Sequence, residues 1–421
     1  MSIVRPLAPP VEPSLPSVLH GVGLRAVFQP VVDLDSNVVI GYEALARGPA
    51  GSAIESPQVL LDAAAEAGVL PEFDCRCRLA ALTAANAGNY PTELLLFLNT
   101  EPASFTEPVP SDIWDAMQAA ARGRSVVMEF TERDLVSNPR SVLEAADWAR
   151  LAGMFIALDD VGAEPMSLAM LSILRPDVVK LDLRLLQNRN ASSEPVANAV
   201  RAYAESTGAV VLAEGIETEE HLGVALSLGA VLGQGWLFGR PEPLPVELPA
   251  GTPVLTHRPA AVSTARSPFD VALEGGRVPR QATRRNLLPL SMSLEHAAEK
   301  EDIPPLLLAS FQDARRFTPG TALRYRRLAE TCPLVAVFGV GMTANPAEGV
   351  RGIAISPSDA FAEEWTVLVV GAHHAAALIA RPLAGSTGAG ADELFEYIVT
   401  HDRDVVSAAA KHSLRRIGKA G

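Results

Sequence analysis

The chain has few cysteines and an excess of acidic over basic residues, and each feature excludes a class of protein. Its 421 residues include three cysteines, of which Cys75 and Cys77 are separated by a single residue. Three cysteines cannot form the disulfide framework of a small secreted domain, so we expect a reducing compartment. The formal net charge of −14 lacks the basic surface that a nucleic-acid polymer or an anionic membrane requires.

Long hydrophobic runs are also missing. The longest, 365–380, is interrupted by Gly371 and by the His373-His374 pair, and it is shorter than the roughly 20 residues that span a bilayer. Residues 1–20 are rich in proline and lack the apolar stretch of a secretory signal. We therefore expect a flexible tail at 1–20 and a cytoplasmic protein without a membrane span.

The remaining sequence is that of an ordinary globular protein, with 48% hydrophobic and 20% charged residues. Eight apolar runs of strand length follow the tail, and helical stretches separate most of them. These runs cover 26–34, 38–45, 94–98, 126–130, 155–158, 178–181, 210–213 and 230–238. Strands that alternate with helices predict a parallel sheet, and eight such units predict an α/β fold closed into a (β/α)8 barrel of the TIM type.

The start of this barrel is expected to be irregular. Only 35–37 separate the first two apolar runs, which is too short for a helical crossover, so these strands should pair as an antiparallel hairpin. Helices are predicted at 59–67, 73–86, 141–152, 168–174 and 196–206. The predicted barrel domain covers 21–248.

A second, smaller α+β domain is predicted at 287–421, after a linker at 249–286 that is rich in proline, threonine, serine and arginine. Within this domain the patterns predict helices at 293–298, 305–316 and 323–331. Strands are predicted at 334–338, 352–354, 365–371 and 375–380. A final helix is predicted from 393 to 414.

Seven successive strands of the predicted barrel each deliver a charged or amide side chain near the carboxyl end. These residues are Glu43, Asn99, Glu129, the pair Asp159-Asp160, Lys180 with Asp182, Glu214 and Gln234. In a barrel the loops at this end converge on one cavity, where active sites lie. Seven such placements argue against ordinary solvated strand ends and predict a ring of acidic groups.

Several carboxylates in one cavity require cations to neutralise them. Oxygen ligands without cysteine or histidine favour two Mg²⁺ or Mn²⁺ ions, and a pair of such ions about 4 Å apart is typical of phosphodiester hydrolysis. Asp159 and Asp160 are suited to bridging the two ions. Lys180 is suited to orienting a water molecule or to stabilising negative charge that develops during the reaction.

The segments FQPVVDL, GYEALARG, FLNT, MEFTE, LDDVG, PDVVKLD, AEGIET and QGWLFGRP follow one another in this order. In order and approximate spacing they resemble the EAL-domain cyclic di-GMP phosphodiesterases. The resemblance implies a metal-dependent hydrolase that converts cyclic di-GMP to linear pGpG, and it suggests a homodimer formed through the barrel. It implies metal ligation by Glu43, Asn99, Glu129, Asp159 and Asp160, catalytic roles for Glu214 as general base, for Lys180 and for Glu43, substrate contacts from Gln29, Leu45, Arg47, Asp182 and Gln234, and supporting roles for Glu132 and Glu217.

One loop differs from the family. After the aspartate pair the family usually reads FGTGYSSL, whereas this chain reads VGAEPMSL, with Glu164 and Pro165 in place of a glycine and a tyrosine. The substitution adds bulk and a fixed φ beside the site. It keeps a second hypothesis open, that the barrel is a weakly active or inactive receptor of cyclic di-GMP. A protein-interaction scaffold is a third hypothesis.

The second domain resembles the DICT domain, a sensory module of bacterial signalling proteins. The resemblance lies in FQDARRFTPGTALRYRRLAE, in PLVAVFGVG and in EEW before TVLVV. It implies that this domain senses an unknown signal or binds a partner and regulates the barrel.

Three further groups are interpreted as structural. Cys75 and Cys77 point to nearly opposite faces of a predicted helix, and His373 and His374, if adjacent in a strand, face opposite sides. Neither pair is therefore expected to bind a metal. A local basic cluster is expected to be a solvated helix face rather than an anion site; it consists of Arg315, Arg316, Arg324, Arg326 and Arg327.

Overall fold

The computed structural model describes residues 14–131, 138–162, 165–182, 184–185, 193–251, 254–256, 263–301, 303–384 and 390–418. Its first eight strands form a closed barrel in sequence order. They are β1 (Arg25–Asp33), β2 (Val38–Arg47), β3 (Leu95–Asn99), β4 (Ser125–Thr131), β5 (Phe155–Val161), β6 (Val178–Leu181), β7 (Val210–Ala213) and β8 (Leu232–Gln234). Each predicted strand coincides with one of these or overlaps it.

The barrel begins with the predicted hairpin. Strands β1 and β2 pair antiparallel, and the chain reverses between them at Asn37, whose φ of 55° lies in the left-handed region that asparagine tolerates. Asp33 Oδ1 accepts a hydrogen bond from the amide of Ser36 at 2.8 Å, which fixes the turn. The pairs that follow, such as β2 with β3 and β6 with β7, are parallel.

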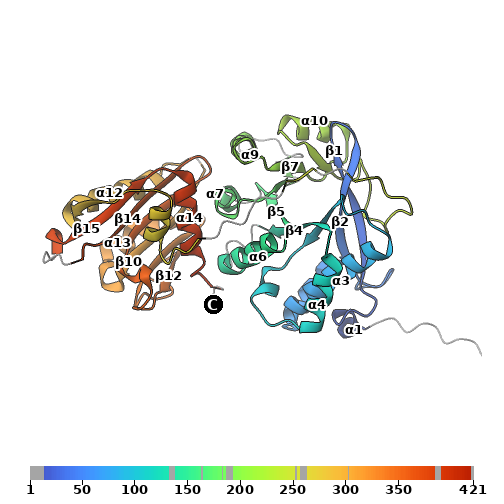
Figure 1. The fold of residues 1–421 in the computed structure, drawn as a ribbon, viewed down its shortest axis with the longest axis horizontal. Helices are drawn as coiled ribbons and strands as arrows, with labels where there is room; N and C mark the ends of the chain where they lie inside the picture. The colour runs from blue at the N-terminus through green and yellow to red at the C-terminus, as the bar shows by residue number, and fades with distance from the viewer. Residues whose placement is uncertain are drawn as a thin grey trace, which may run out of the picture. The chain divides into compact units, whose positions relative to one another are not determined.

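Helices cover the outside of the barrel (Figure 1). They are α2 (Pro57–Glu66), α3 (Leu70–Ala87), α4 (Ser111–Ala121), α6 (Pro139–Leu151), α7 (Pro165–Leu174), α9 (Ser193–Thr207) and α10 (Glu219–Ser227), and a short α1 (Leu15–Leu19) precedes the first strand. The five predicted helices overlap five of these, whereas α1, α4 and α10 were not predicted. Helix α1 lies within the predicted tail 1–20, where Val18 and Leu19 are buried, so that part of the tail prediction is wrong. No helix in the described part of the chain is both long enough and apolar enough to cross a bilayer.

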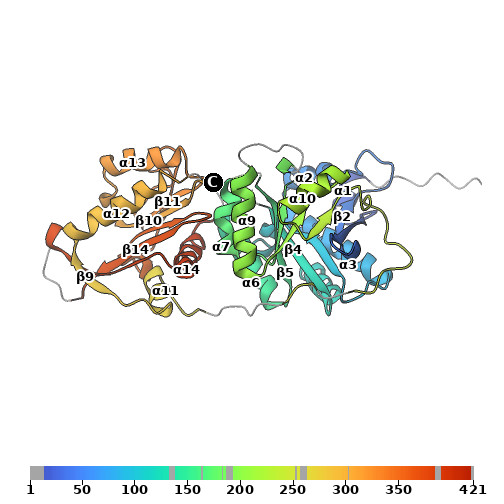
Figure 2. The ribbon, with the colours of Figure 1, turned by 90° about the horizontal axis from the view of Figure 1, so that it is seen from above.

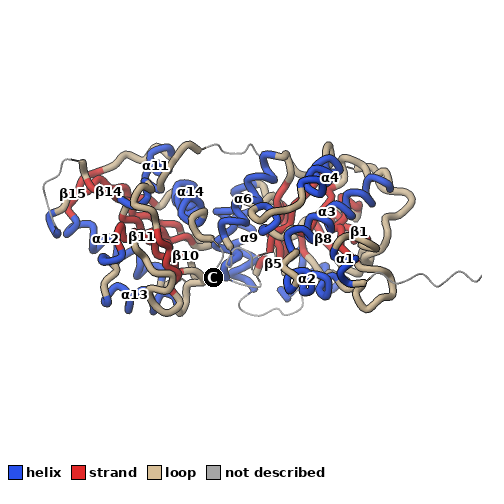
Figure 3. Tube along the Cα trace, turned by 90° about the horizontal axis from the view of Figure 1, so that it is seen from below, coloured by secondary structure: helices blue, strands red, loops and turns tan. Residues whose placement is uncertain are grey.

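The second domain is a seven-stranded sheet with helices on both faces. Its strands run in the order β12 (Val350–Ala354), β11 (Val335–Val340), β10 (Leu306–Asp313), β13 (Trp365–Val370), β14 (Ala375–Pro382), β15 (Leu394–Thr400) and β9 (Arg280–Thr283). Figure 2 and, from the opposite side, Figure 3 show α12 (Arg284–Ala298) and α13 (Pro319–Ala329) on one face, with α11 (Pro268–Glu274) and α14 (Arg403–Leu414) on the other. The predicted fold class, an irregular barrel plus a smaller α+β domain, is confirmed.

One predicted helix of this domain is wrong, and another is correct only in its second half. The segment 305–316 forms the strand β10, which is central in the sheet and pairs with both β11 and β13. A strand buried on both faces carries a continuous apolar run, and such a run cannot be told from a buried helix by periodicity. The predicted helix at 393–414 is strand β15 followed by α14, because Asp402 accepts hydrogen bonds from the amides of Asp404 and Val405 and begins the helix there.

Part of the predicted linker at 249–286 is structured. Helix α11 begins after Ser267, whose side chain accepts a hydrogen bond from the amide of Asp270, and β9 pairs antiparallel with β15. A short edge strand with an Arg-Gln-Ala-Thr sequence has little apolar signal, and its place in the sheet depends on a partner more than 100 positions later in the chain.

Candidate active site

The polar residues predicted from the strand ends lie at or near the carboxyl ends of β2 to β8. Because parallel strands of one closed barrel have their carboxyl ends at the same rim, these side chains belong to one end of the barrel. Two groups of them are joined by hydrogen bonds or ion pairs.

The first group is centred on Glu43, a buried carboxylate of β2. Its Oε1 accepts a hydrogen bond from Asn99 Nδ2 at 2.8 Å, and its Oε2 accepts one from Gln234 Nε2 at 2.7 Å. Gln234 Nε2 also lies 3.3 Å from Gln29 Oε1, and Gln29 Nε2 donates to the carbonyl of Gly239 at 3.1 Å. Side-chain amides from β3 and β8 therefore fix both oxygens of Glu43.

Glu129 lies beside this group. It pairs with Asn99 across the parallel strands β3 and β4, and only 1% of its surface is exposed. Burying an isolated ion costs about 20 kcal/mol by an idealised estimate, and relaxation of the protein reduces this cost to several kcal/mol. A carboxylate as buried as Glu129 therefore has to be paired or to coordinate a cation. Glu129 is thus positioned to pair with another group or to bind a cation, and not to be solvated by water.

The second group is centred on Lys180 of β6. Its Nζ lies 3.1 Å from Asp159 Oδ1 and 2.9 Å from Glu214 Oε1, and only 1% of the lysine side chain is exposed. Asp159, Asp160 and Glu214 also each offer a carboxylate oxygen, and these atoms lie within 4.8 Å of one another. One buried ammonium group therefore bridges two carboxylates of a set of three.

This second group fits a divalent cation by its charge and by its donor atoms. Three carboxylates against one lysine leave an excess of two negative charges. All three candidate ligands donate oxygen, which is the preference of Mg²⁺, Mn²⁺ and Ca²⁺. Among the residues that the structure describes, no other group of acidic, histidine or cysteine side chains meets the same distance criterion.

A bulge in β5 brings Asp159 and Asp160 together. Adjacent residues of a regular strand face opposite sides, but the register of β5 against β6 shifts between Leu158 and Val161. Asp160 has a φ of 55°, and its amide donates to Asp159 Oδ1 at 2.9 Å. The left-handed residue breaks the alternation, so both carboxylates reach the same group.

Asp182, predicted to contact substrate, is held by Arg184. Its carboxylate accepts hydrogen bonds from the Arg184 amide at 2.6 Å and from Arg184 Nη2 at 3.0 Å. The arginine side chain is 64% exposed, whereas that of Asp182 is 9% exposed. Sequence reasoning missed Arg184, although its position two residues after the aspartate was a usable signal.

Leu45 and Arg47 lie half-buried near the end of β2. Arg47 pairs across the hairpin with Arg25. Burial, together with Arg25, lowers the pKa of the Arg47 guanidinium, while Glu55 and Glu43 oppose this effect. Arg47 nevertheless remains cationic at neutral pH, because the ordinary pKa of arginine lies far above neutrality.

The loop after the aspartate pair is partly described. Gly162 has a φ of 98°, and a Cβ there would meet Leu185 Cδ1 at 2.6 Å and Val196 Cγ1 at 2.9 Å, so only glycine fits. Pro165 is the first residue of α7, where a fixed φ suits helix initiation. Glu132 and Glu164 lie outside the described residues. Glu217 is exposed, and its amide lies 3.3 Å from His221 Nδ1 at the start of α10.

The remaining sequence interpretations concern the cysteines of α3 and residues of the second domain. Cys75 and Cys77 lie on α3 as free thiols. His373 and His374 lie in the turn between β13 and β14, which falls between the two predicted strands. Within the basic cluster, Arg315 pairs with Asp313 at 2.8 Å and Arg316 with Glu393 at 3.4 Å.

Comparison with protein families gives two matches. The model of the EAL domain matches residues 14–241. A model described as "Sensory domain in DIguanylate Cyclases and Two-component system", the DICT domain, matches residues 271–383.

Similar proteins include the "Cyclic di-GMP phosphodiesterase RocR" of Pseudomonas aeruginosa, 28% identical over 55% of this chain and 61% of that protein. The "Probable cyclic di-GMP phosphodiesterase PdeI" of Escherichia coli is 24% identical over 52% of this chain and 29% of that protein. A manganese/cy-diGMP complex of Klebsiella pneumoniae BlrP1 is 30% identical, covering 53% of this chain and 57% of that one with a TM-score of 0.47. The aligned part of this chain thus spans less than two thirds of each of these relatives.

Proposed function

The chain belongs to the EAL domain family, and from this premise we propose that its barrel hydrolyses cyclic di-GMP to linear pGpG with the help of two divalent cations. The observation that carries the proposal is the group of Asp159, Asp160, Glu214 and Lys180. It combines cation ligands with a buried ammonium group and a carboxylate that can accept a proton. The names of the relatives RocR and PdeI supply the substrate.

We assign the two cations to Glu43, Asn99, Glu129, Asp159 and Asp160. Bound Mg²⁺ or Mn²⁺ would supply Lewis acidity, lowering the pKa of a water molecule and neutralising phosphate oxygens. The chain contributes rigid placement. Gln234 and Asn99 fix the orientation of Glu43 through hydrogen bonds of 2.7 and 2.8 Å, and the bulge at Asp160 aims the aspartate pair at one point.

Glu214 is proposed as the general base. Its side chain is 21% exposed, whereas that of Asp159, the other carboxylate that Lys180 contacts, is 13% exposed. A water molecule can therefore reach Glu214 more easily. Lys180 Nζ at 2.9 Å from Glu214 Oε1 orients the carboxylate that would accept a proton from the attacking water. Lys180 also stabilises the negative charge that develops on the phosphate.

Substrate contacts are proposed for Gln29, Leu45, Arg47, Asp182 and Gln234, with Glu132 and Glu217 in support. The cationic Arg47 suits a phosphate oxygen, because its planar guanidinium can donate two parallel hydrogen bonds. Gln29 and Gln234 would act mainly by orienting Glu43, since their amides are linked to it or to each other. Asp182 would act together with Arg184, which donates a hydrogen bond to its carboxylate.

The test is a product assay on the full chain. Cyclic di-GMP is incubated with the protein and Mn²⁺ or Mg²⁺, and pGpG is separated by chromatography. We expect Glu214→Gln to lower product formation by about 100-fold, the usual contribution of a general base, while Glu220→Gln, an exposed glutamate of α10, leaves it unchanged. Equal turnover by both variants would contradict the assignment of Glu214.

The receptor hypothesis is the second candidate, favoured by the altered loop VGAEPMSL. It predicts saturable binding of cyclic di-GMP by the full chain with no pGpG after hours of incubation. We also propose that the DICT-like domain regulates the barrel and that barrels form a homodimer. A change in turnover when the signal of the DICT-like domain is added would support regulation. The mass measured by sedimentation tests the homodimer.

A further inference from the structure

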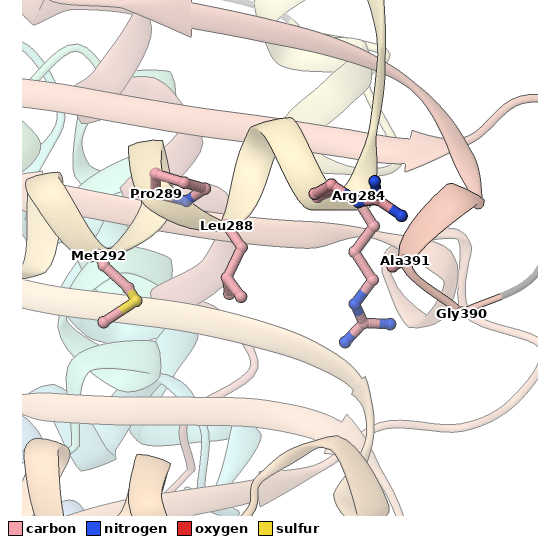
Figure 4. A pocket seen from close by; sticks show the side chains of 7 residues that line it. Arg284, Leu288, Pro289, Met292, Gly390 and Ala391 are labelled. Carbon is pink, nitrogen blue, oxygen red and sulfur yellow. The ribbon is translucent and has the colours of Figure 1, made fainter.

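A pocket of about 610 Å³ lies on the second domain, beside the first half of α12. It is lined by Arg284, Arg285, Leu288, Pro289, Met292, Gly390 and Ala391. Figure 4 shows Leu288 and Met292 on the same side of α12, with Gly390 and Ala391 near the start of the helix. The volume falls in the range of about 300–1,000 Å³ that is typical of small-molecule sites.

The apolar wall of this pocket is not part of the domain core. Helix α12 packs on the sheet through Leu287, which joins Trp365, Leu378 and Phe395 in a buried cluster. Leu288 and Met292 lie four residues apart on a different face of the helix and are 46% and 44% exposed. These two neighbouring apolar side chains are therefore available for contact with an apolar group that enters the pocket.

The two arginines at the other end of the pocket, Arg284 and Arg285, belong to a group that also contains Arg316, which does not line the pocket, and this group carries an excess positive charge. Glu393 is shared by Arg284 at 3.6 Å and Arg316 at 3.4 Å, and Arg285 pairs with Asp392 at 3.0 Å. Three guanidinium groups face two carboxylates, so one positive charge is not balanced within this group. Arg284 is held in place, because its guanidinium lies 5.8 Å from the ring centre of Trp365.

We propose that this pocket binds a small monoanionic amphiphile, an aliphatic chain that ends in a carboxylate. The carboxylate would bind at Arg284 and Arg285, and the chain would cover Leu288, Pro289 and Met292. The charge excess of one favours a monoanion over a phosphate dianion. From Arg285 to Met292 the helix rises seven residue steps, about 10 Å at 1.5 Å each, which suits a chain of medium length.

Titration calorimetry with sodium octanoate on the full chain tests this proposal, with 1-octanol as the uncharged probe of equal length. We expect saturable binding of one octanoate per chain and weaker binding of 1-octanol. Leu288→Gln should weaken octanoate about tenfold, as expected for the loss of an apolar contact in a pocket. Leu290→Gln is the matched control, because Leu290 is 42% exposed on the same helix and does not line the pocket.

Arg285→Gln tests the charged end. It should remove the preference for octanoate over 1-octanol, whereas Arg280→Gln on the neighbouring strand β9 should keep it. Three results would each overturn the proposal. The heats of octanoate binding do not saturate, the Leu288→Gln and Leu290→Gln variants bind octanoate with equal affinity, or the unmodified chain binds octanoate and 1-octanol equally. A change of sedimentation mass in Leu288→Gln without octanoate binding would mark the surface as a contact between copies and would overturn it too.

Discussion

Asp160 shows how one residue decides the geometry of the carboxylate group. Its φ of 55° places it in the left-handed region, which aspartate and asparagine tolerate better than other residues with a Cβ. Replacement by asparagine keeps that tolerance and the size of the side chain but removes the charge. The backbone role and the proposed ligand role of this position can therefore be separated.

We predict that Asp160→Asn and Asp160→Ala both abolish measurable hydrolysis of cyclic di-GMP, because each removes a proposed ligand. Only Asp160→Ala should also lower the free energy of unfolding, by about 1 kcal/mol, since alanine pays the full cost of the left-handed conformation. Urea unfolding of both variants checks the difference. Equal unfolding midpoints would show that the strain at this position is unimportant.

Glu364 is a second residue whose environment has a measurable consequence. It is buried in the second domain and accepts hydrogen bonds from the amide of Phe269 at 3.1 and 3.2 Å. Burial raises its pKa to about 8, although the hydrogen bonds from Ser267 and Phe269 oppose the rise. A raised pKa means that between about pH 4.5 and 8 the folded protein holds a proton that the unfolded chain has lost.

The stability that this proton provides is present at low pH and is lost as the pH rises toward 8. We predict that the free energy of unfolding of the second domain falls by about 1 kcal/mol per pH unit from pH 6 to 8, following the free energy of one pKa unit. Glu364→Gln should flatten this dependence, and Glu363→Gln, an exposed neighbour, should not. Urea titrations at pH 6, 7 and 8 measure it, and a flat profile of the unmodified chain would contradict the prediction.

At the scale of elements, packing leaves room only for glycine at residue 162, which follows β5. Gly162 follows the last residue of β5, and the side chains of Leu185 and Val196 occupy the space where a Cβ would lie. A larger residue must displace α9 or the backbone beside Asp160. The position of the aspartate pair therefore depends on a glycine that carries no functional group.

We predict that Gly162→Ala lowers the free energy of unfolding by about 2–4 kcal/mol, from the positive φ and from overpacking of about 1–3 kcal/mol, and reduces turnover. Gly153→Ala is the matched control, because Gly153 also has a positive φ but no atom lies within 4 Å of the position that a Cβ would take. It should cost about 1 kcal/mol from the backbone alone. Thermal unfolding and the product assay compare the two, and equal losses would exclude the packing explanation.

At the scale of the whole molecule, the proposed metal binding by carboxylates at the barrel rim would couple stability to metal ions. The chain carries a net charge of −14, and the group of Asp159, Asp160 and Glu214 concentrates part of it. A cation that binds only the folded chain stabilises it by mass action. Metal binding can thus be measured without catalysis.

We predict that Mn²⁺ or Mg²⁺ raises the unfolding temperature of the full chain and that chelation by EDTA reverses the rise and stops product formation. At a concentration 100 times the dissociation constant the stabilisation is about 2.7 kcal/mol. Asp160→Asn should show a smaller rise. An unchanged unfolding temperature with Mn²⁺, measured by calorimetry, would argue against metal binding by this group.

The sequence alone determined the barrel, its antiparallel start and the set of residues at its rim. Each buried strand is a local apolar run, and a polar residue at or near its end is visible in the same short segment. The sequence failed where the outcome depends on distant partners. Strand β10 lies between β11 and β13 and is buried by helices such as α12, so its apolar run resembled a helix. The edge strand β9 is defined only by pairing with β15.

Only the tertiary structure decided how the rim residues meet. The bulge and the left-handed φ of Asp160 bring adjacent aspartates to one point, Lys180 bridges Asp159 and Glu214, and Arg184 holds Asp182. The pocket beside α12 likewise combines residues from 284–292 and 390–391. Such groupings come from the packing of segments far apart in the chain, and no local pattern of residue types encodes the distances between their side chains.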